Sequence, residues 1–132
     1  MRARKIKDDI FWMGAVDWER RLFDSLIPLP DGTSYNAYLI RGSEKTVLID
    51  TVDPPKTDIL MSQLQGVDNI DLIISQHAEQ DHSGTIPTVL EKYPKARVIV
   101  SPKAKEMLID LLKMPEDQLQ TVDDGETISL GN

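Results

Sequence analysis

Two short runs of apolar residues, each followed by a helical pattern, constrain the fold of this chain more than any other feature. The runs are Leu-Ile-Ile at 72–74 and Val-Ile-Val at 98–100. Strands that are apolar on both faces are typical of a sheet whose two faces are both covered. After the first run, apolar side chains recur at i, i+3, i+4 and i+7, which are Ile86, Val89, Leu90 and Tyr93. The sequence therefore predicts an α/β fold in which strands and helices alternate.

The second run also predicts a helix after it. Ser101 is a favourable N-cap, and Pro102 suits the first helical position. The apolar stripe of this helix is expected to face the sheet, and it consists of Ala104, Met107, Leu108, Leu111 and Leu112. Met107 and Met114 are expected to fill gaps in the core.

The first half of the chain predicts strands and one helix. A strand is expected at 10–13 and a hairpin from strands at 35–41 and 46–50. A helix is expected between an N-cap at Asp53 and Gly66. Near the end of the sequence, a second hairpin is expected. Its strands would be 119–122 and 127–130, joined by Asp-Asp-Gly at 123–125. The larger aromatic side chains are expected to be packing residues, and they are Trp12, Trp18, Phe23, Tyr35 and Tyr38.

The composition excludes several classes of function. A length of 132 residues is typical of one domain, and a net charge of −7 argues against a nucleic-acid partner. The apolar run at 10–16 is too short for a membrane span and too charged at its flank for a signal peptide. We therefore expect a cytoplasmic protein with no membrane partner. Because the chain has no cysteine, a bound metal would take nitrogen and oxygen ligands.

One six-residue window holds four candidate metal ligands. His77, Glu79, Asp81 and His82 follow the apolar run at 72–74, and both histidines of the chain are among them. In an extended loop, residues two apart point the same way, so the first three side chains would converge while the last approaches from the adjacent position. Two imidazoles and two carboxylates suit iron or manganese better than structural zinc, although zinc stays an alternative.

Other residues near this window have supporting or competing roles. Asp50, at the end of the apolar run at 47–49, is expected to orient an imidazole or a loop amide, and Ser75 and Thr51 are weaker candidates for that role. A loop without metal is the competing interpretation. In that case the polar side chains are solvated, or Asp81 or Ser83 caps the helix that follows.

The residues of this window resemble a known family. The sequence H-A-E-Q-D-H-S-G at 77–84, preceded by V-L-I-D-T at 47–51, is similar to the motif of the metallo-β-lactamase superfamily. Glutamate replaces the second histidine of H-x-H-x-D-H, which is the variant that marks the flavodiiron proteins. Two further stretches are also similar to the amino-terminal region of those enzymes. One is 14–18, followed by Arg21 and Phe23, and the other is 32–40.

This resemblance implies a fold and a cofactor. The fold would be a metallo-β-lactamase-like αβ/βα sandwich, a mixed sheet with flanking helices, of which this chain is the amino-terminal portion. Residues 1–132 would form a partial domain, without the flavodoxin-like domain that holds FMN. Two iron ions would form a non-haem centre that reduces dioxygen to water or nitric oxide to nitrous oxide. A rubredoxin-type or flavin donor would supply the electrons.

The resemblance also implies roles for the residues of the window. His77 and Glu79 would ligate one iron and Asp81 the other, and His82 is a ligand of the second iron in some members only. Asp50 matches the strand-end aspartate of the superfamily. Two further histidines and a bridging aspartate would come from outside this chain.

Two other functions remain open at this point, together with one prediction about assembly. The chain could belong to a zinc-dependent hydrolase of the same superfamily, or to a diiron oxygen-sensing module without turnover. Because half of a sandwich leaves an apolar sheet face uncovered, we expect a homodimer that buries this face.

Overall fold

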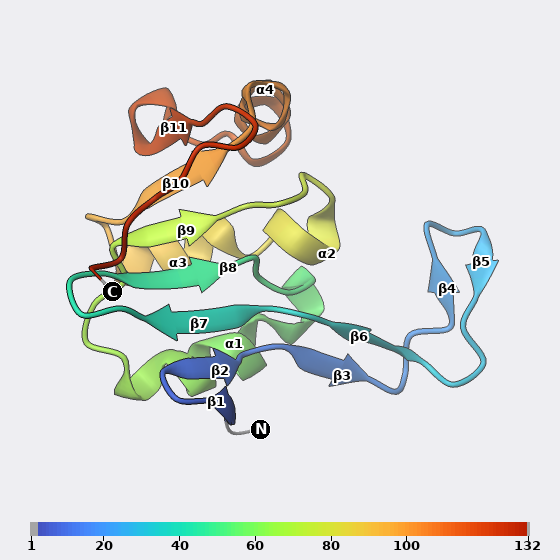
Figure 1. Cartoon of the computed structure of the whole chain (residues 1–132). Coiled ribbons are helices and arrows are strands. Elements are labelled where there is room, and N and C mark those ends of the chain that lie inside the picture. Colours follow the sequence, from blue (N-terminus) through green and yellow to red (C-terminus); the bar gives the residue numbers. More distant parts are fainter. Residues whose placement is uncertain (1–2, 132) are drawn as a thin grey trace.

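One seven-stranded mixed sheet organises residues 3–131, the part of the chain that the computed structural model describes. Its strand order is β1-β2-β7-β8-β9-β10-β11 (Figure 1). The strands of this sheet are β1 (Arg4–Lys7), β2 (Ile10–Trp12), β7 (Tyr38–Arg41), β8 (Thr46–Ile49), β9 (Leu72–Ile74), β10 (Arg97–Val100) and β11 (Leu119–Thr121). The α-helices are α1 (Thr57–Gln63), α2 (Gln80–Ser83), α3 (Ile86–Lys92) and α4 (Pro102–Leu112). Three short 3-10 helices are η1 (Pro54–Lys56), η2 (Leu64–Gly66) and η3 (Glu116–Gln118).

The sheet is antiparallel at one end and parallel at the other. β7 and β8 form the predicted hairpin, and β1, β2 and β7 pair antiparallel beside it. From β8 to β11 the pairing is parallel, and helices lie in each connection. The prediction of an α/β fold with a mixed sheet and flanking helices is confirmed.

Helices cover one face of the sheet. Cross-strand partners share a face, and the row Leu39, Leu48, Ile73 and Val98 is almost completely buried in the main core. Figure 1 shows α1 and α3 on this side of the strands. The helix stripe of Ile86, Val89, Leu90 and Tyr93 belongs to the same core, as its spacing predicts.

Leu48 lies at the centre of this core, with no exposed surface. Replacing Leu48 by alanine is expected to lower the free energy of unfolding by about 2 to 5 kcal/mol, because buried contacts are lost and a cavity remains. Urea denaturation measures the effect as a lower midpoint at an unchanged slope. Leu111→Ala is a matched control, since the Leu111 side chain is 67% exposed and its loss should change stability little.

The opposite face of the sheet is also apolar. Tyr38, Ile49, Ile74 and Ile99 are successive cross-strand partners on this side. The final segment of the chain, 122–130, crosses this face (Figure 1), and its apolar side chains pack against the strands. The backbone oxygen of Leu130 accepts hydrogen bonds at the β7–β8 turn, with a distance of 3.0 Å from the amide of Glu44. The face is therefore partly covered by the chain itself, and homodimerisation through it stays a prediction.

The structure corrects the predicted second hairpin. Residues 119–121 form β11, which pairs parallel with β10, while 127–130 form no strand. The reason is competition between partners, because β10 offers a free edge and the tail bonds instead to the β7–β8 turn.

Two expectations about buried side chains are also wrong. In α4 only Leu108 is buried, whereas Met107 and Leu111 are 42% and 67% exposed, because this helix packs mainly against β10 and β11 at the end of the sheet. Trp18 is 70% exposed, since it lies outside the core. Met114 is buried as expected.

In the described part of the chain, no helix has the length and apolar character needed to cross a membrane.

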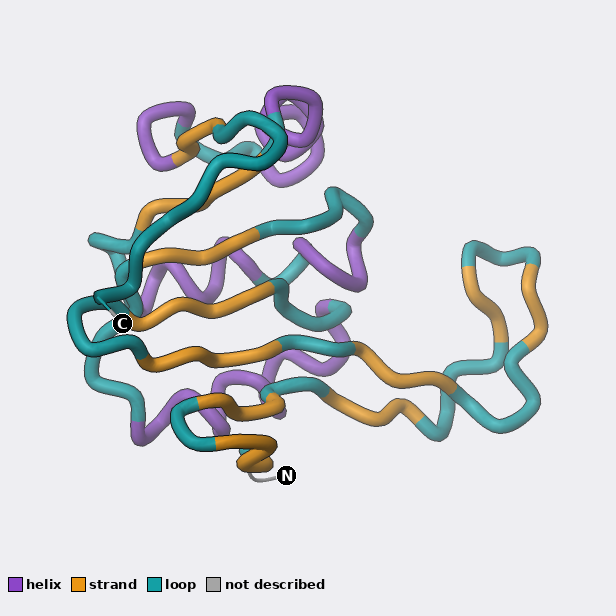
Figure 2. The backbone as a smooth tube through the Cα atoms, in the orientation of Figure 1, coloured by secondary structure: helices purple, strands orange, loops and turns teal. Residues whose placement is uncertain are grey.

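A two-stranded ribbon and a hairpin project from the sheet. The ribbon pairs β3 (Ala15–Asp17) with β6 (Thr33–Tyr35), and the hairpin pairs β4 (Leu22–Phe23) with β5 (Ile27–Pro28). Figure 2 shows the hairpin at the far end of the ribbon. Asp24 and Ser25 have φ of 49° and 58°, and the amide of Leu26 donates to the oxygen of Phe23 at 3.0 Å. Two such residues in a four-residue turn are typical of a tight hairpin turn.

Candidate metal centre

The candidate ligands lie at the carboxyl ends of β8 and β9. Parallel pairing brings these two strand ends together, and the amide of Asp50 donates to the oxygen of Ile74 at 2.8 Å. After Glu79 the chain turns into α2, and the Glu79 oxygen accepts the amide of His82 at 3.0 Å. The prediction of one extended loop is therefore wrong for Asp81 and His82, which lie on a helical turn.

The four side chains form two pairs, each with one imidazole and one carboxylate. The Nε2 atom of His77 lies 3.3 Å from Oε1 of Glu79, and Nε2 of His82 lies 3.6 Å from Oδ2 of Asp81. The two imidazole rings are 5.4 Å apart between centroids and nearly perpendicular. The side chains of His77 and Glu79 are about half exposed, and those of Asp81 and His82 are more buried.

Asp50 orients this part of the chain in two ways. Its Oδ1 accepts the amide of Gln76 at 2.8 Å, and its Oδ2 lies 3.1 Å from Nδ1 of His82. The residue is 3% exposed and has a φ of 54°, a left-handed conformation that aspartate tolerates better than most residues. A carboxylate bound at Nδ1 places the imidazole proton there and leaves Nε2 free as a ligand.

Hydroxyl groups hold the backbone around the same residues. Thr51 donates to the carbonyl of His82 from both its amide and its hydroxyl, at 2.8 and 2.7 Å. The hydroxyl of Ser75 donates to the oxygen of His77 at 2.9 Å, and that of Ser83 donates to Ala78 at 2.9 Å. Thr51 and Ser75 therefore fix the backbone of the two histidines rather than the imidazole rings.

The donor set fits metal ions that prefer nitrogen and oxygen. Within residues 3–131 no three such side chains form one ready-made group, and the donors stand as two pairs. Each pair offers one neutral nitrogen and one carboxylate oxygen, a mixture that iron and manganese accept. The carboxylate of Asp50 behind His82 matches the support that metal-bound histidines usually have. Each pair is therefore a candidate pair of donors for one metal ion.

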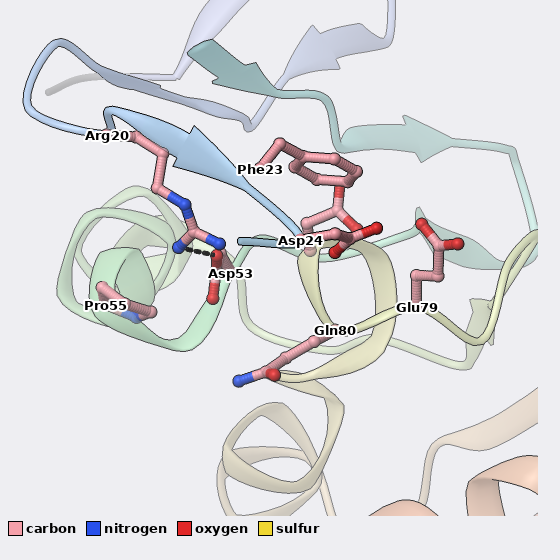
Figure 3. Close-up of a pocket in the computed structure, with 8 residues that line it drawn as sticks. Arg20, Phe23, Asp24, Asp53, Pro55, Glu79 and Gln80 are labelled. Carbon is pink, nitrogen blue, oxygen red and sulfur yellow. Dashed lines mark hydrogen bonds and ion pairs between the residues drawn. The ribbon is translucent and has the colours of Figure 1, made fainter. Parts of the chain in front are cut away.

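A cavity of about 250 Å³ adjoins the candidate ligands. Figure 3 shows Phe23 and Asp24 from the hairpin between Arg20 and Glu79, with Arg20 above Asp53. The Nη1 atom of Arg20 lies 2.9 Å from Oδ2 of Asp53. The cavity is lined by Arg20, Phe23, Asp24, Asp53, Pro55, Glu79, Gln80 and Asp81. It gives a small substrate a place directly beside two of the candidate ligands.

A second buried ion pair lies near the cavity. Lys56 pairs with Asp17 at 3.1 Å, and the hydroxyl of Tyr35 donates to the same carboxylate at 3.3 Å. Burial by itself would raise the pKa of Asp17, but Lys56, the Glu19 amide and Tyr35 together hold that pKa below its ordinary value. Burial, followed by the charges of Asp53 and Asp17, raises the pKa of Tyr35 to about 12.

The raised pKa of Tyr35 predicts a loss of stability at alkaline pH. The folded state holds the phenol proton more tightly than the unfolded state, so the contribution is complete below pH 10.0 and is lost as pH rises toward about 12. We expect the free energy of unfolding to fall by about 2 to 3 kcal/mol across this range. Urea denaturation at several pH values measures it. Tyr35→Phe should flatten this part of the profile, and an equally steep profile would contradict the assignment.

Sequence reasoning missed most of the cavity. No sequence pattern indicates that Arg20 and Asp24 line the cavity, because no periodicity links residues 20–24 to residues 53 and 79–81. Asp53 was expected to cap a helix with its side chain. It is the residue before η1, but its carboxylate binds Arg20 instead and makes no capping hydrogen bond. The proline pair at 54–55 was the only local sign of a constrained turn here.

Comparison with known proteins places these features in a family context. Residues 30–130 match the family model described as Metallo-beta-lactamase superfamily. The chain is 39% identical over 131 residues to the anaerobic nitric oxide reductase flavorubredoxin of Vibrio vulnificus, covering 96% of this chain and 26% of that protein.

Solved structures of similar proteins have the same fold. Rubredoxin oxygen:oxidoreductase from Desulfovibrio gigas superposes with a TM-score of 0.91 at 34% identity, over 98% of this chain and 33% of that one. The flavodiiron protein from Giardia intestinalis gives a TM-score of 0.89 at 28% identity, over 99% of this chain and 32% of that one. The chain thus spans about a third or less of the length of these relatives.

Proposed function

Because this chain belongs to the metallo-beta-lactamase superfamily, we propose that it supplies half of a two-iron centre in an oxidoreductase of the flavodiiron type. The proposed reaction is reduction of dioxygen to water or of nitric oxide to nitrous oxide. The observation that carries the proposal is the two imidazole–carboxylate pairs at the ends of β8 and β9, with Asp50 behind one of them. Similarity to flavodiiron proteins along nearly the whole chain supports it.

Each residue of the centre would have a distinct role. His77 and Glu79 would hold one iron, and Asp81 the other, with His82 as its second donor from this chain. Asp50 would keep the Nε2 atom of His82 available by accepting a hydrogen bond from Nδ1–H. When bound, two ferrous ions supply electrons to a small diatomic substrate. The remaining ligands would come from residues outside this chain.

The cavity beside Glu79 and Asp81 would admit the substrate. Its walls are the hairpin, the turn at 53–55 and the start of α2, so the side chains of this chain orient and enclose what enters it. A flavodoxin-like domain with FMN, outside residues 1–132, would deliver electrons from a rubredoxin-type or flavin donor. We also propose a cytoplasmic location and a homodimer.

Metal analysis combined with an activity assay tests the proposal. A protein of flavodiiron length that carries this chain should contain about two irons per chain. It should also consume dioxygen or nitric oxide under reducing conditions. Zinc at the same stoichiometry, with hydrolysis of an ester or thioester, would favour the hydrolase instead. Iron binding without turnover of either gas would favour the sensing module.

A further inference from the structure

The β4–β5 hairpin has little apolar contact to hold it in place. Leu22, Leu26 and Ile27 are 49%, 79% and 52% exposed, although apolar burial normally fixes such an element. Figure 2 shows the hairpin beyond the end of the β3–β6 ribbon. Its position against the cavity must therefore depend on specific polar contacts.

One guanidinium provides such contacts. The Nε atom of Arg20 donates to the backbone oxygen of Leu22 at 2.8 Å, and its Nη1 donates to Oδ2 of Asp53 at 2.9 Å. A single side chain thus joins the first strand of the hairpin to the turn that precedes η1. The Asp53 side chain is 6% exposed, so its charge needs this partner.

The backbone of Arg20 is oriented as well. Oδ1 of Asp17 accepts the amides of Glu19 and Arg20, each at 3.2 Å, and Lys56 binds the same carboxylate. Lys56 belongs to η1, the same turn that follows Asp53. Two ion pairs therefore connect the base of the hairpin to one segment, residues 53–56, beside the candidate ligands.

We propose that Arg20 is a positioning residue that anchors the β4–β5 hairpin to Asp53 and thereby fixes the Phe23 and Asp24 wall of the cavity. The planar guanidinium is suited to this role, because it donates in two directions at once, whereas a lysine ammonium is a compact point charge. The consequence for substrate access rests on the proposed function. The position of the hairpin does not.

Distances between spin labels in the metal-free 132-residue protein test the anchor. The chain has no cysteine, so labels attach only at Leu26→Cys on the hairpin and Lys103→Cys at the start of α4. With Arg20 present, the distance distribution should be narrow. The pair of substitutions Arg20→Gln and Asp53→Asn should broaden it, because the anchor is lost without leaving a buried charge unpaired.

Two further variants make the test specific. Arg20→Lys keeps the charge opposite Asp53, so its distance distribution should be broader than that of the unsubstituted protein but narrower than that of the double variant. If the double variant fails to fold, a broader distribution in Arg20→Lys than in the unsubstituted protein supports the anchor in its place. Lys105→Gln with Glu116→Gln removes another ion pair, 3.1 Å long, away from the cavity and should leave the distribution narrow. The proposal is overturned if the distance distribution stays as narrow as in the unsubstituted protein after Arg20 is lost. It is also overturned if the control variant broadens the distribution by the same amount.

Kinetics in the protein of flavodiiron length test the link to the cavity. Loss of the anchor should raise KM for the gaseous substrate more than it lowers kcat, because the wall moves while the ligands stay in place. A broadened hairpin with unchanged KM would overturn this link. Since the distance measurement requires neither metal nor turnover, its result is independent of whether the proposed reaction is correct.

Discussion

In a protein of flavodiiron length that carries this chain, substitution of His77 by alanine together with Glu79 by glutamine is expected to remove one of the two proposed metal ions and to abolish turnover. The physical reason is that these two side chains form one of the two donor pairs, with 3.3 Å between Nε2 and Oε1. Losing an outer partner of a metal ligand costs about 10-fold to 100-fold in affinity or activity, so losing the two proposed ligands should cost more than about 100-fold. Plasma mass spectrometry and gas consumption measure the two effects.

The fold should tolerate these substitutions. The side chains of His77 and Glu79 are 56% and 53% exposed, so the free energy of unfolding should change by no more than about 0.5 kcal/mol. Glu106→Gln, an exposed carboxylate on α4, is the matched control and should leave two metal ions bound. If the double variant keeps both metal ions and full activity, His77 and Glu79 have no metal role and are simply solvated.

Replacing Asp50 by asparagine is expected to weaken metal binding by about 10-fold to 100-fold, although Asp50 would touch no metal. Asparagine can still accept the Gln76 amide and tolerates the left-handed backbone at a φ of 54°. It cannot offer a second carboxylate oxygen to Nδ1 of His82. The imidazole then loses the carboxylate contact at Nδ1 that would hold a ring proton there.

Two measurements separate this effect from a general loss of structure. Nitrogen NMR of His82 should report a single tautomer in the unsubstituted protein and a mixture after Asp50→Asn. Asp71→Asn is the matched control, because Asp71 accepts the Thr46 amide at 2.8 Å at the opposite ends of the same strands. Calorimetric titration with manganous ion should find weaker binding for the first variant only. If Asp50→Asn binds manganous ion as tightly as the unsubstituted protein does, Asp50 is dispensable for metal binding.

The fold was predictable where one local pattern decided the outcome. The apolar runs at 72–74 and 98–100 are parallel strands that are buried except for part of Ile74, and the stripe from Ile86 to Tyr93 faces the core. Such patterns depend only on the spacing of side chains along a strand or helix. The stripe of α4 shows the limit, because Met107 and Leu111 have the right spacing but no surface above them to pack against.

The candidate site was predictable only as a set of residues. Four donors within six positions, and an aspartate at a strand end, were visible without a structure. Their pairing was not, because it depends on the turn into α2 after Glu79 and on the parallel alignment of β8 with β9. The contact from Asp50 to His82 spans 32 positions, and tertiary structure alone creates it.

The sequence by itself determined the α/β class, the order of the central strands and helices, and the choice of His77, Glu79, Asp81 and His82 as candidate metal ligands. These follow from periodicity and from the donor atoms of single residues. The tertiary structure decided the cavity, the anchor between Arg20 and Asp53, and the path of the final segment across the sheet. The physical reason is that each of these depends on contacts between residues far apart in the chain, which only the packed sheet brings together.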